Sequence, residues 1–235
     1  MREPFLPVRP QPQADPARRQ TSLRIALLTG GIDRHYAVGL GMALMEQDLA
    51  LDVIGSDEID GPEFQGNPRA RFRNLHRTLQ SASLARRIRG ILVFYARLFR
   101  YVLTAKAKIF HILWNNKLPI FDRTLLMLFY KLAGRKVVFT AHNVNAGRRD
   151  RNDSWLNRTT LRGQYKLADH IFVHTKKMKN ELADEFGVEA NKVTVIPYGI
   201  NNAVPFSTLT REEGRQQLGL RSDEKAILHF GAIRP

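Results

Sequence analysis

A histidine and an asparagine follow an apolar run near the middle of this 235-residue sequence, where a buried strand is expected to end. Residues 137–145 read VVFTAHNVN, so three apolar residues give way to a polar tip that carries His142 and Asn143. An imidazole can transfer a proton near neutral pH, and it can also hydrogen-bond a sugar hydroxyl. His142 is therefore a candidate catalytic residue, and a histidine that only caps or packs the turn is the alternative.

Two glycines, Gly30 and Gly31, follow an earlier apolar run and precede a segment with helical periodicity. Glycine lets backbone amides approach a phosphate or a sugar closely. The residues after Gly31 are Ile32, Asp33 and Arg34, so the pattern matches neither a dinucleotide fingerprint nor a P-loop. A tight turn between strand and helix is the alternative interpretation.

Similar residues follow the other segments that read as strands. They are Thr29 after the first, Trp114, Asn115 and Asn116 after the fourth, Thr140 at the end of the fifth, His174 and Thr175 after the sixth, and Tyr198 and Gly199 after the seventh. Such a row along one edge of a sheet is what a polar ligand cleft requires, although loops are polar for other reasons too. His170 and His174 are four residues apart, but they lie on an expected strand and lack the carboxylate of the helical H-E-x-x-H motif, so the pattern does not favour a metal site.

The elements that must position these residues alternate between strand and helix. Strands are expected at 23–29, 49–55, 69–76, 107–114, 136–141, 169–175 and 192–197, with helices around 37–44 and at 84–103, 123–134, 154–167 and 176–187. The strands are short and apolar throughout, as parallel strands covered by helices are. The pattern predicts an α/β fold built on a doubly wound parallel sheet of Rossmann-like type. In such sheets ligands bind beyond the carboxyl ends of the strands, where the candidate residues lie.

Three regions are expected along the chain. Residues 1–22 hold five prolines and predict a disordered, proline-rich arm. Residues 23–204 are expected to form the Rossmann-like domain. Residues 205–235 predict a linker helix at 211–220 and a strand from 225 that would open a second domain, which we expect to be incomplete.

Composition excludes several classes of protein. The chain has no cysteine, so it has no disulfide framework, thiolate metal site or cysteine nucleophile. Its N-terminus lacks the apolar core of a secretory signal, and no apolar run approaches the roughly 18–20 residues of a transmembrane helix. We expect a cytoplasmic protein, or one that lies peripherally on the inner face of the plasma membrane.

The formal charge of +15 is concentrated in one interval. No acid occurs between Glu63 and Asp122, and twelve basic residues do. Such a positive field favours an anionic partner, with a solvated basic face as the alternative.

On the predicted helix at 84–103, an apolar stripe runs beside Arg86, Arg87, Arg89, Arg97 and Arg100. That helix could lie on anionic lipid, or its stripe could pack on the sheet and leave only the arginines outside. Nucleic acid is not favoured, because no RNA-recognition signature or zinc-finger spacing is present.

Several segments together resemble glycosyltransferase family 4 of the GT-B superfold. They are the GGIDRH loop at 30–35, TAHNVN at 140–145, LADHIFVHTKKMKNEL at 167–182, VIPYGIN at 195–201, and the connector that leads into ILHFG at 227–231. Each segment alone is a weak signal, but they occur in the family's order over residues 23–235.

The resemblance implies two Rossmann-like domains that face a cleft, with the acceptor on the N-terminal domain and a nucleotide-sugar on the C-terminal one. It implies transfer without a metal or other cofactor, usually with retention at the anomeric carbon. Gly30 and Gly31 would lie near the donor diphosphate and the acceptor, and His142 near the transferred sugar. The other donor or acceptor contacts are expected to be His35, Asn143, Thr175, Tyr198, Gly199 and Arg234. The expected acceptor is a glycan or a lipid-linked molecule of bacterial surface polysaccharide or glycolipid assembly.

The sequence also departs from the family's pattern. Ala232 stands where an arginine is common, and Asn201 replaces a commoner aspartate. The lysine that usually follows is missing because the chain ends at Pro235. The sequence therefore predicts an N-terminal half that is inactive by itself, and a non-catalytic module that binds anionic membrane or a phosphorylated ligand through residues 64–121 is the alternative.

Overall fold

The computed structural model describes residues 23–31, 33–76, 83–198, 208–221 and 223–227. The chain divides into two units, residues 1–199 and 200–235. The candidate residues in the described ranges belong to the first unit. The expected N-terminal arm, Gly199, Asn201, Ala232 and Arg234 lie outside the described residues.

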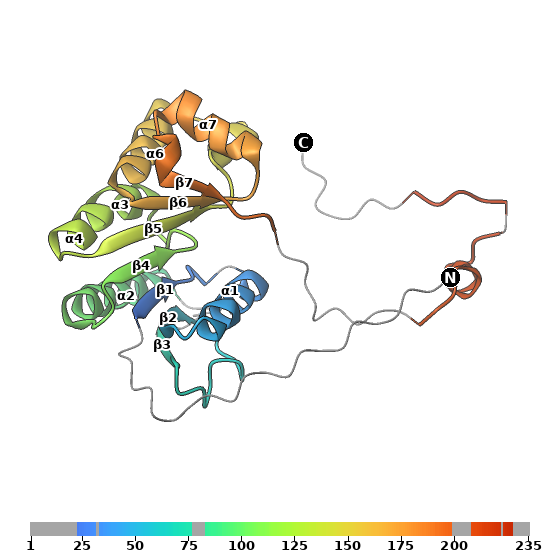
Figure 1. The fold of residues 1–235 in the computed structure, drawn as a ribbon, viewed down its shortest axis with the longest axis horizontal. Helices are drawn as coiled ribbons and strands as arrows, with labels where there is room; N and C mark the ends of the chain where they lie inside the picture. Colours follow the sequence, from blue (N-terminus) through green and yellow to red (C-terminus); the bar gives the residue numbers. More distant parts are fainter. Residues whose placement is uncertain (1–22, 32, 77–82, 199–207, 222, 228–235) are drawn as a thin grey trace. The chain divides into compact units, whose positions relative to one another are not determined.

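Seven parallel strands of the described chain form one sheet, in the order β3-β2-β1-β4-β5-β6-β7 (Figure 1). The strands are β1 (Arg24–Leu28), β2 (Ala50–Ser56), β3 (Ala70–His76), β4 (Ile109–Ile112), β5 (Lys136–Ala141), β6 (His170–Val173) and β7 (Val193–Val195). The direction of strand addition reverses between β1 and β4, which is the switch point where ligands bind in folds of this kind. The predicted doubly wound parallel sheet is confirmed.

The sheet is buried because helices cover both of its faces. Alternate residues of β1 enter different cores: Ala26 and Leu28 pack in one, and Ile25 and Leu27 in the other. Figure 1 shows α1 and α2 on opposite sides of this part of the sheet. The helices of the first unit are α1 (Arg34–Glu46), α2 (Leu84–Thr104), α3 (Pro119–Phe121), the π-helical turn η1 (Asp122–Leu126), α4 (Met127–Leu132), α5 (Ala146–Arg149), α6 (Trp155–Leu167), α7 (Lys176–Phe186) and the 3-10 turn η2 (Ala190–Lys192).

The carboxyl ends of the central strands are level with one another. Leu28 on β1 pairs with Ile112 on β4, and Ile112 pairs with Phe139 on β5. Phe139 in turn pairs with Ile171 on β6. The residues that follow each of these positions therefore emerge along a common edge.

Polar side chains begin two of the helices at this same edge. Asp33 accepts a hydrogen bond from the backbone N–H of Tyr36 at 3.0 Å and starts α1. Thr175 accepts one from the backbone N–H of Met178 at 3.1 Å and starts α7. Each cap satisfies an amide that would otherwise lack a partner, and it fixes where the helix begins.

Some element boundaries differ from the predictions. The helix predicted from 123 begins at Pro119, which suits the first position of a helix, and it passes through a π-helical turn before α4. In the second unit, α8 (Arg211–Gln217) is stabilised by a capping box between Thr210 and Glu213. The strand predicted from 225 is absent from residues 225–227, and its remainder lies outside the described residues.

Candidate active site

Five aromatic rings from five separate segments meet at the carboxyl edge of the sheet. Tyr36 comes from the first turn of α1, Trp114 follows β4, His142 follows β5, His174 follows β6 and Tyr198 follows β7. We call this set the ring cluster. It assembles residues that are up to 162 positions apart in sequence, from 36 to 198.

His142 contacts several other rings of the ring cluster. Its imidazole stacks on the indole of Trp114, with ring centroids 4.1 Å apart and planes within 4° of parallel. The ring of Tyr36 meets it edge-on at 4.6 Å. On the other side, His174 stacks on Tyr198 at 3.8 Å. Such aromatic contacts fix the orientation of a side chain as well as burying it.

The two histidines are also joined by hydrogen bonds. His174 Nε2 lies 3.0 Å from His142 Nδ1, and the Tyr198 hydroxyl lies 3.1 Å from that same Nδ1. The other ring nitrogen of His142, Nε2, is buried and has no hydrogen-bond partner. A buried polar atom without a partner costs about 1–3 kcal/mol, so it calls for an explanation. A ligand group can satisfy Nε2 only if a neighbouring ring moves aside.

The environment keeps these imidazoles neutral at neutral pH. The pKa of His142 is lowered to about 4, mainly by burial and in smaller part by the nearby His174, while Asp33 opposes the shift. Burial also lowers the pKa of His174. His111, which hydrogen-bonds Thr140 at 2.8 Å, has a pKa lowered to about 4 by burial. At pH 7, His142 can therefore give or accept a hydrogen bond but does not carry a charge.

The glycine loop packs directly against Trp114. Gly30 and Gly31 have φ angles of +62° and +71°, in the left-handed region that favours glycine. A Cβ atom on Gly30 would lie 2.7 Å from Trp114 Cβ and 3.0 Å from the Trp114 carbonyl oxygen. The Gly31 amide already donates to Thr29 Oγ1 at 3.3 Å. These contacts favour the tight-turn interpretation, in which Gly30 lets the loop support Trp114.

A small hollow, partly open to solvent, adjoins this loop at the ends of β1 and β2. Its lining includes Gly30, Ser56, Phe94, Asn116 and Lys117. The Ser56 hydroxyl is buried without a partner, and Lys117 brings a positive charge. Gly30 borders both the hollow and Trp114, so the glycine loop separates the hollow from the ring cluster. The hollow offers hydrogen bonds and a cation to a polar ligand.

The structure brings together some of the predicted site residues. His142 and Tyr198 belong to the ring cluster, Gly30 packs against Trp114, and Gly31 faces Ser56. Thr175 contributes differently, because its hydroxyl is used as the cap of α7.

Two other predicted residues point elsewhere. His35 is exposed, and its neighbour Tyr36 takes the position in the ring cluster. Asn143 is exposed and accepts a hydrogen bond from Arg149 Nη1 at 2.9 Å. Gly199 and Arg234 lie outside the described residues.

Three members of the ring cluster were absent from the predicted site. Trp114 and His174 stood in the row of residues at the strand ends, which was the available signal for both. Tyr36 had no such signal beyond its place in the first turn after the glycine loop. Within the described ranges, no three His, Asp, Glu or Cys side chains gather as metal ligands, and no helix is long and apolar enough to cross a membrane.

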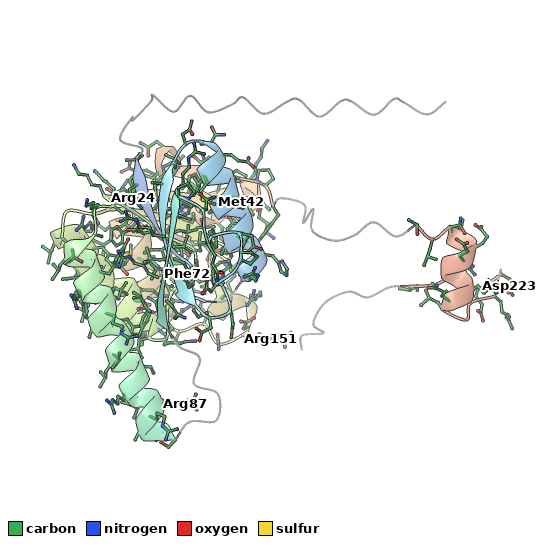
Figure 2. All side chains as sticks on the ribbon, turned by 90° about the horizontal axis from the view of Figure 1, so that it is seen from below. Arg24, Met42, Phe72, Arg87, Arg151 and Asp223 are labelled. Carbon is green, nitrogen blue, oxygen red and sulfur yellow. The ribbon has the colours of Figure 1, made fainter. Side chains whose placement is uncertain are left out.

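The two ends of α2 differ in their surroundings. Toward its C-terminal end, Phe94, Leu98 and Val102 are buried in the core. Residues 83–89 are all exposed, and Figure 2 shows Arg87 on an end of the helix that extends beyond the rest of its unit. Arg86, Arg87, Arg89, Arg97 and Arg100 are all exposed. The apolar stripe therefore packs on the core along only part of its length.

Comparisons with known proteins agree with this fold and with the order of the motifs. The sequence pattern of Glycosyltransferase Family 4 matches residues 29–204. A stretch of 70 residues is 31% identical to D-inositol 3-phosphate glycosyltransferase from Kineococcus radiotolerans, but it spans only 30% of this chain and 16% of that protein.

Two solved structures share the fold at low sequence identity. Sucrose-phosphate synthase from Thermosynechococcus elongatus matches with a TM-score of 0.52 and 16% identity, over 76% of this chain and 90% of that one. HepE from Anabaena, in complex with UDP and glucose, matches with a TM-score of 0.52 and 16% identity. That match covers 84% of this chain and 50% of HepE, so the chain spans about half of that relative's length. With the family pattern covering most of its length, this chain belongs to glycosyltransferase family 4.

Proposed function

We propose that this chain forms the acceptor-side half of an enzyme that moves a sugar from a nucleotide-sugar donor to a hydroxyl of a glycan or lipid-linked acceptor. The observation that carries the proposal is the neutral His142, whose buried Nε2 has no partner at the switch edge of the sheet. An unsatisfied imidazole nitrogen at that place suits hydrogen bonding to a sugar hydroxyl.

The chemistry of glycosyl transfer explains how this half would contribute. The reaction needs a positioned acceptor hydroxyl and stabilisation of the charge on the departing diphosphate. The small hollow beside Gly30 would bind one polar group of an acceptor, because Ser56, Asn116 and Lys117 line it. As the family resemblance implies, we propose a metal-independent, retaining reaction in the assembly of a bacterial surface polysaccharide or glycolipid.

We also propose that residues 1–235 transfer little sugar by themselves. The described residues supply the acceptor wall and the ring cluster, whereas the matched part of HepE is only half of that protein. Charge on a leaving diphosphate would then be stabilised mainly by groups outside the described ranges.

The test is an assay of the protein as its gene encodes it. It is incubated with UDP-, GDP- and ADP-linked sugars and a bacterial glycolipid fraction, and acceptor-dependent release of nucleoside diphosphate is measured. We expect one class of donor to be consumed by the complete protein, with little release by residues 1–235 alone. If the complete protein uses none of the donors, the proposed function fails, whereas strong turnover by residues 1–235 contradicts only the proposed dependence on a second half.

A second function, docking on anionic membrane, is favoured by the free end of α2. Leu84, Ile88 and Leu92 are 72%, 49% and 66% exposed, and arginines flank them. An apolar strip bordered by cations is the pattern of helices that lie in the interface of anionic bilayers. The same helix, α2, also reaches the hollow, because its Phe94 lines it. A membrane bound at the exposed end of α2 would therefore hold a lipid-linked acceptor on the side of the hollow.

Vesicle co-sedimentation tests the docking surface. We expect the chain to bind vesicles that contain phosphatidylglycerol more tightly than neutral vesicles, by about 1 kcal/mol for each basic residue near the surface. The double variant Arg86→Glu, Arg87→Glu should lose most of this binding. The matched control, Lys106→Glu with Lys108→Glu, makes the same charge change at the other end of α2 and should lose less. Equal losses from both variants would indicate a general effect of net charge and contradict a specific docking surface.

A further inference from the structure

Three groups form a continuous line of hydrogen bonds behind His142. The carbonyl oxygen of Ile196 lies 3.0 Å from His174 Nδ1. His174 Nε2 lies 3.0 Å from His142 Nδ1. The line ends at His142 Nε2, which has no partner. Each imidazole is thus hydrogen-bonded through specific nitrogens. The tautomer of each ring follows from whether its partner can donate or accept a hydrogen bond.

The carbonyl at the start of the line sets the direction of every bond. A carbonyl oxygen can only accept, so His174 Nδ1 carries a hydrogen and donates to Ile196. A neutral imidazole carries only one N–H, so His174 Nε2 presents a lone pair. His142 Nδ1 must then donate to it, which leaves the lone pair of His142 on Nε2.

The neutral forms that this reasoning requires agree with the surroundings. Burial lowers the pKa of both imidazoles. The groups that face them are the uncharged hydroxyls of Tyr36 and Tyr198, whose pKa values burial raises, and the Asp33 carboxylate, which partly opposes the shift at His142.

Because Tyr198 also contacts His142 Nδ1, His174 is needed to keep the hydrogen of His142 on that nitrogen. Its hydroxyl lies 3.1 Å from the same His142 Nδ1, and a hydroxyl can either donate or accept. While His174 accepts from Nδ1, the Tyr198 oxygen can only be a second acceptor. Without the His174 nitrogen, the Tyr198 hydroxyl is free to donate to Nδ1, and His142 then carries its hydrogen on Nε2.

We propose that His174 is a positioning residue that holds His142 in the Nδ1–H tautomer, so that Nε2 accepts a hydrogen bond from a substrate hydroxyl. The identity of the substrate rests on the proposed glycosyl transfer, whereas the tautomer rests on the hydrogen bonds alone. An acceptor nitrogen selects for groups that carry a hydrogen, such as a sugar hydroxyl. It repels a deprotonated phosphate or carboxylate oxygen, so His142 would face a sugar ring and not the diphosphate.

Nitrogen NMR of the imidazoles tests the proposal without any enzyme assay. In 15N-histidine-labelled chain at pH 7.5, long-range proton–nitrogen correlations distinguish a protonated ring nitrogen from one with a lone pair. We expect Nδ1 to be protonated and Nε2 unprotonated in both His142 and His174. A His142 that carries its hydrogen on Nε2 would overturn the proposal.

Two variants of His174 separate its nitrogen from its ring. His174→Phe keeps a ring against Tyr198 but has no acceptor, so His142 should shift toward the Nε2–H tautomer. His174→Gln offers a side-chain oxygen to His142 Nδ1 and should keep the Nδ1–H tautomer. His170, which contacts Thr194 Oγ1 at 2.9 Å near the start of β6, should keep its spectrum in both variants. An unchanged His142 tautomer in His174→Phe refutes the role of His174.

Kinetics then connect the tautomer to the proposed reaction. In the complete protein, we expect His174→Phe to lower kcat by at least about tenfold, as loss of the required imidazole tautomer does elsewhere, and His174→Gln to retain most of it. A shift of tautomer with unchanged kcat would keep the positioning role of His174 but contradict the use of Nε2 in transfer. Loss of the expected tautomers in the wild-type spectrum would contradict the inference itself, whatever the activity.

Discussion

Replacing His142 with alanine is expected to lower kcat of the complete protein by about 10²–10³-fold, the usual effect of removing one preorganised hydrogen-bonding group. The Kd of the donor should change much less. The reason is that His142 offers a single buried nitrogen at the carboxyl edge of the sheet, whereas nucleotide binding would rely on groups outside the described residues. Rapid-quench kinetics measure the transfer step, and calorimetry measures the donor Kd.

A phenylalanine at the same position distinguishes hydrogen bonding from packing. His142→Phe keeps a ring that can stack on Trp114, so it removes the nitrogens with little change in volume. If the nitrogen is what matters, His142→Phe should be nearly as slow as His142→Ala. Full activity in His142→Phe would mean that the ring only supports Trp114. His170→Ala is the control, because that histidine is hydrogen-bonded to Thr194 near the opposite end of the strand that carries His174.

The sequence was sufficient to place His142 but not to assemble the ring cluster. An apolar run that ends abruptly in polar residues locates the end of a buried strand, and parallel strands present such ends along one edge. The stack of His142 on Trp114 depends on how two loops meet across β4 and β5. Nothing in the spacing of these two residues along the chain specifies that contact.

Tyr36, and not the predicted His35, lies in the ring cluster because of how α1 is rotated about its axis. Successive residues of an α-helix point about 100° apart, so an error of one residue moves a side chain from the site to solvent. The start of the helix is fixed by Asp33, whose carboxylate accepts the backbone N–H of Tyr36. A cap of this kind is visible in the sequence, but the direction in which the first turn faces depends on packing of the whole helix.

The exposed end of α2 has a similar explanation. Its 21 residues rise roughly 32 Å at about 1.5 Å each, whereas the 7 residues of β3 extend roughly 23 Å at about 3.3 Å each. An amphipathic stripe as long as the helix therefore cannot pack along its full length on the neighbouring strand. Periodicity indicates which face is apolar, but it does not say how far the sheet extends beneath it.

Replacing Gly30 with alanine is expected to lower the free energy of unfolding by about 2–5 kcal/mol, because two costs coincide there. A left-handed backbone costs a residue with Cβ roughly 1–2 kcal/mol, and forcing an atom into a packed contact costs about 1–3 kcal/mol. The added Cβ would meet Trp114 Cβ at 2.7 Å and backbone oxygens of Trp114 and Asn115 at 3.0 and 3.1 Å. Backbone atoms cannot rotate away, so the loop or Trp114 has to shift.

Two other glycines separate the contributions to this effect. Gly134 has φ of +71° and no atom within 4 Å of an added Cβ, so Gly134→Ala measures the backbone cost alone. Gly31 also has φ of +71°, but its added Cβ meets only the side chain of Ser56, which can move. Urea unfolding should therefore rank Gly30→Ala as clearly the most destabilising of the three, with Gly31→Ala close to Gly134→Ala. The entropy that alanine removes from the unfolded chain is similar at each site, so it does not alter the order.

Gly30→Ala should also disturb the packing around Trp114 at urea concentrations too low to unfold the protein. The chain has two tryptophans, so Trp155→Phe leaves Trp114 as the only fluorescent indole. In that background, we expect Gly30→Ala to shift the emission of Trp114 at low urea, and Gly134→Ala to leave it unchanged. A Gly30→Ala protein that loses stability without any change at Trp114 would mean that the loop moves instead of the indole. The stack that holds His142 would then be independent of Gly30, and the loop would keep only its role as a turn.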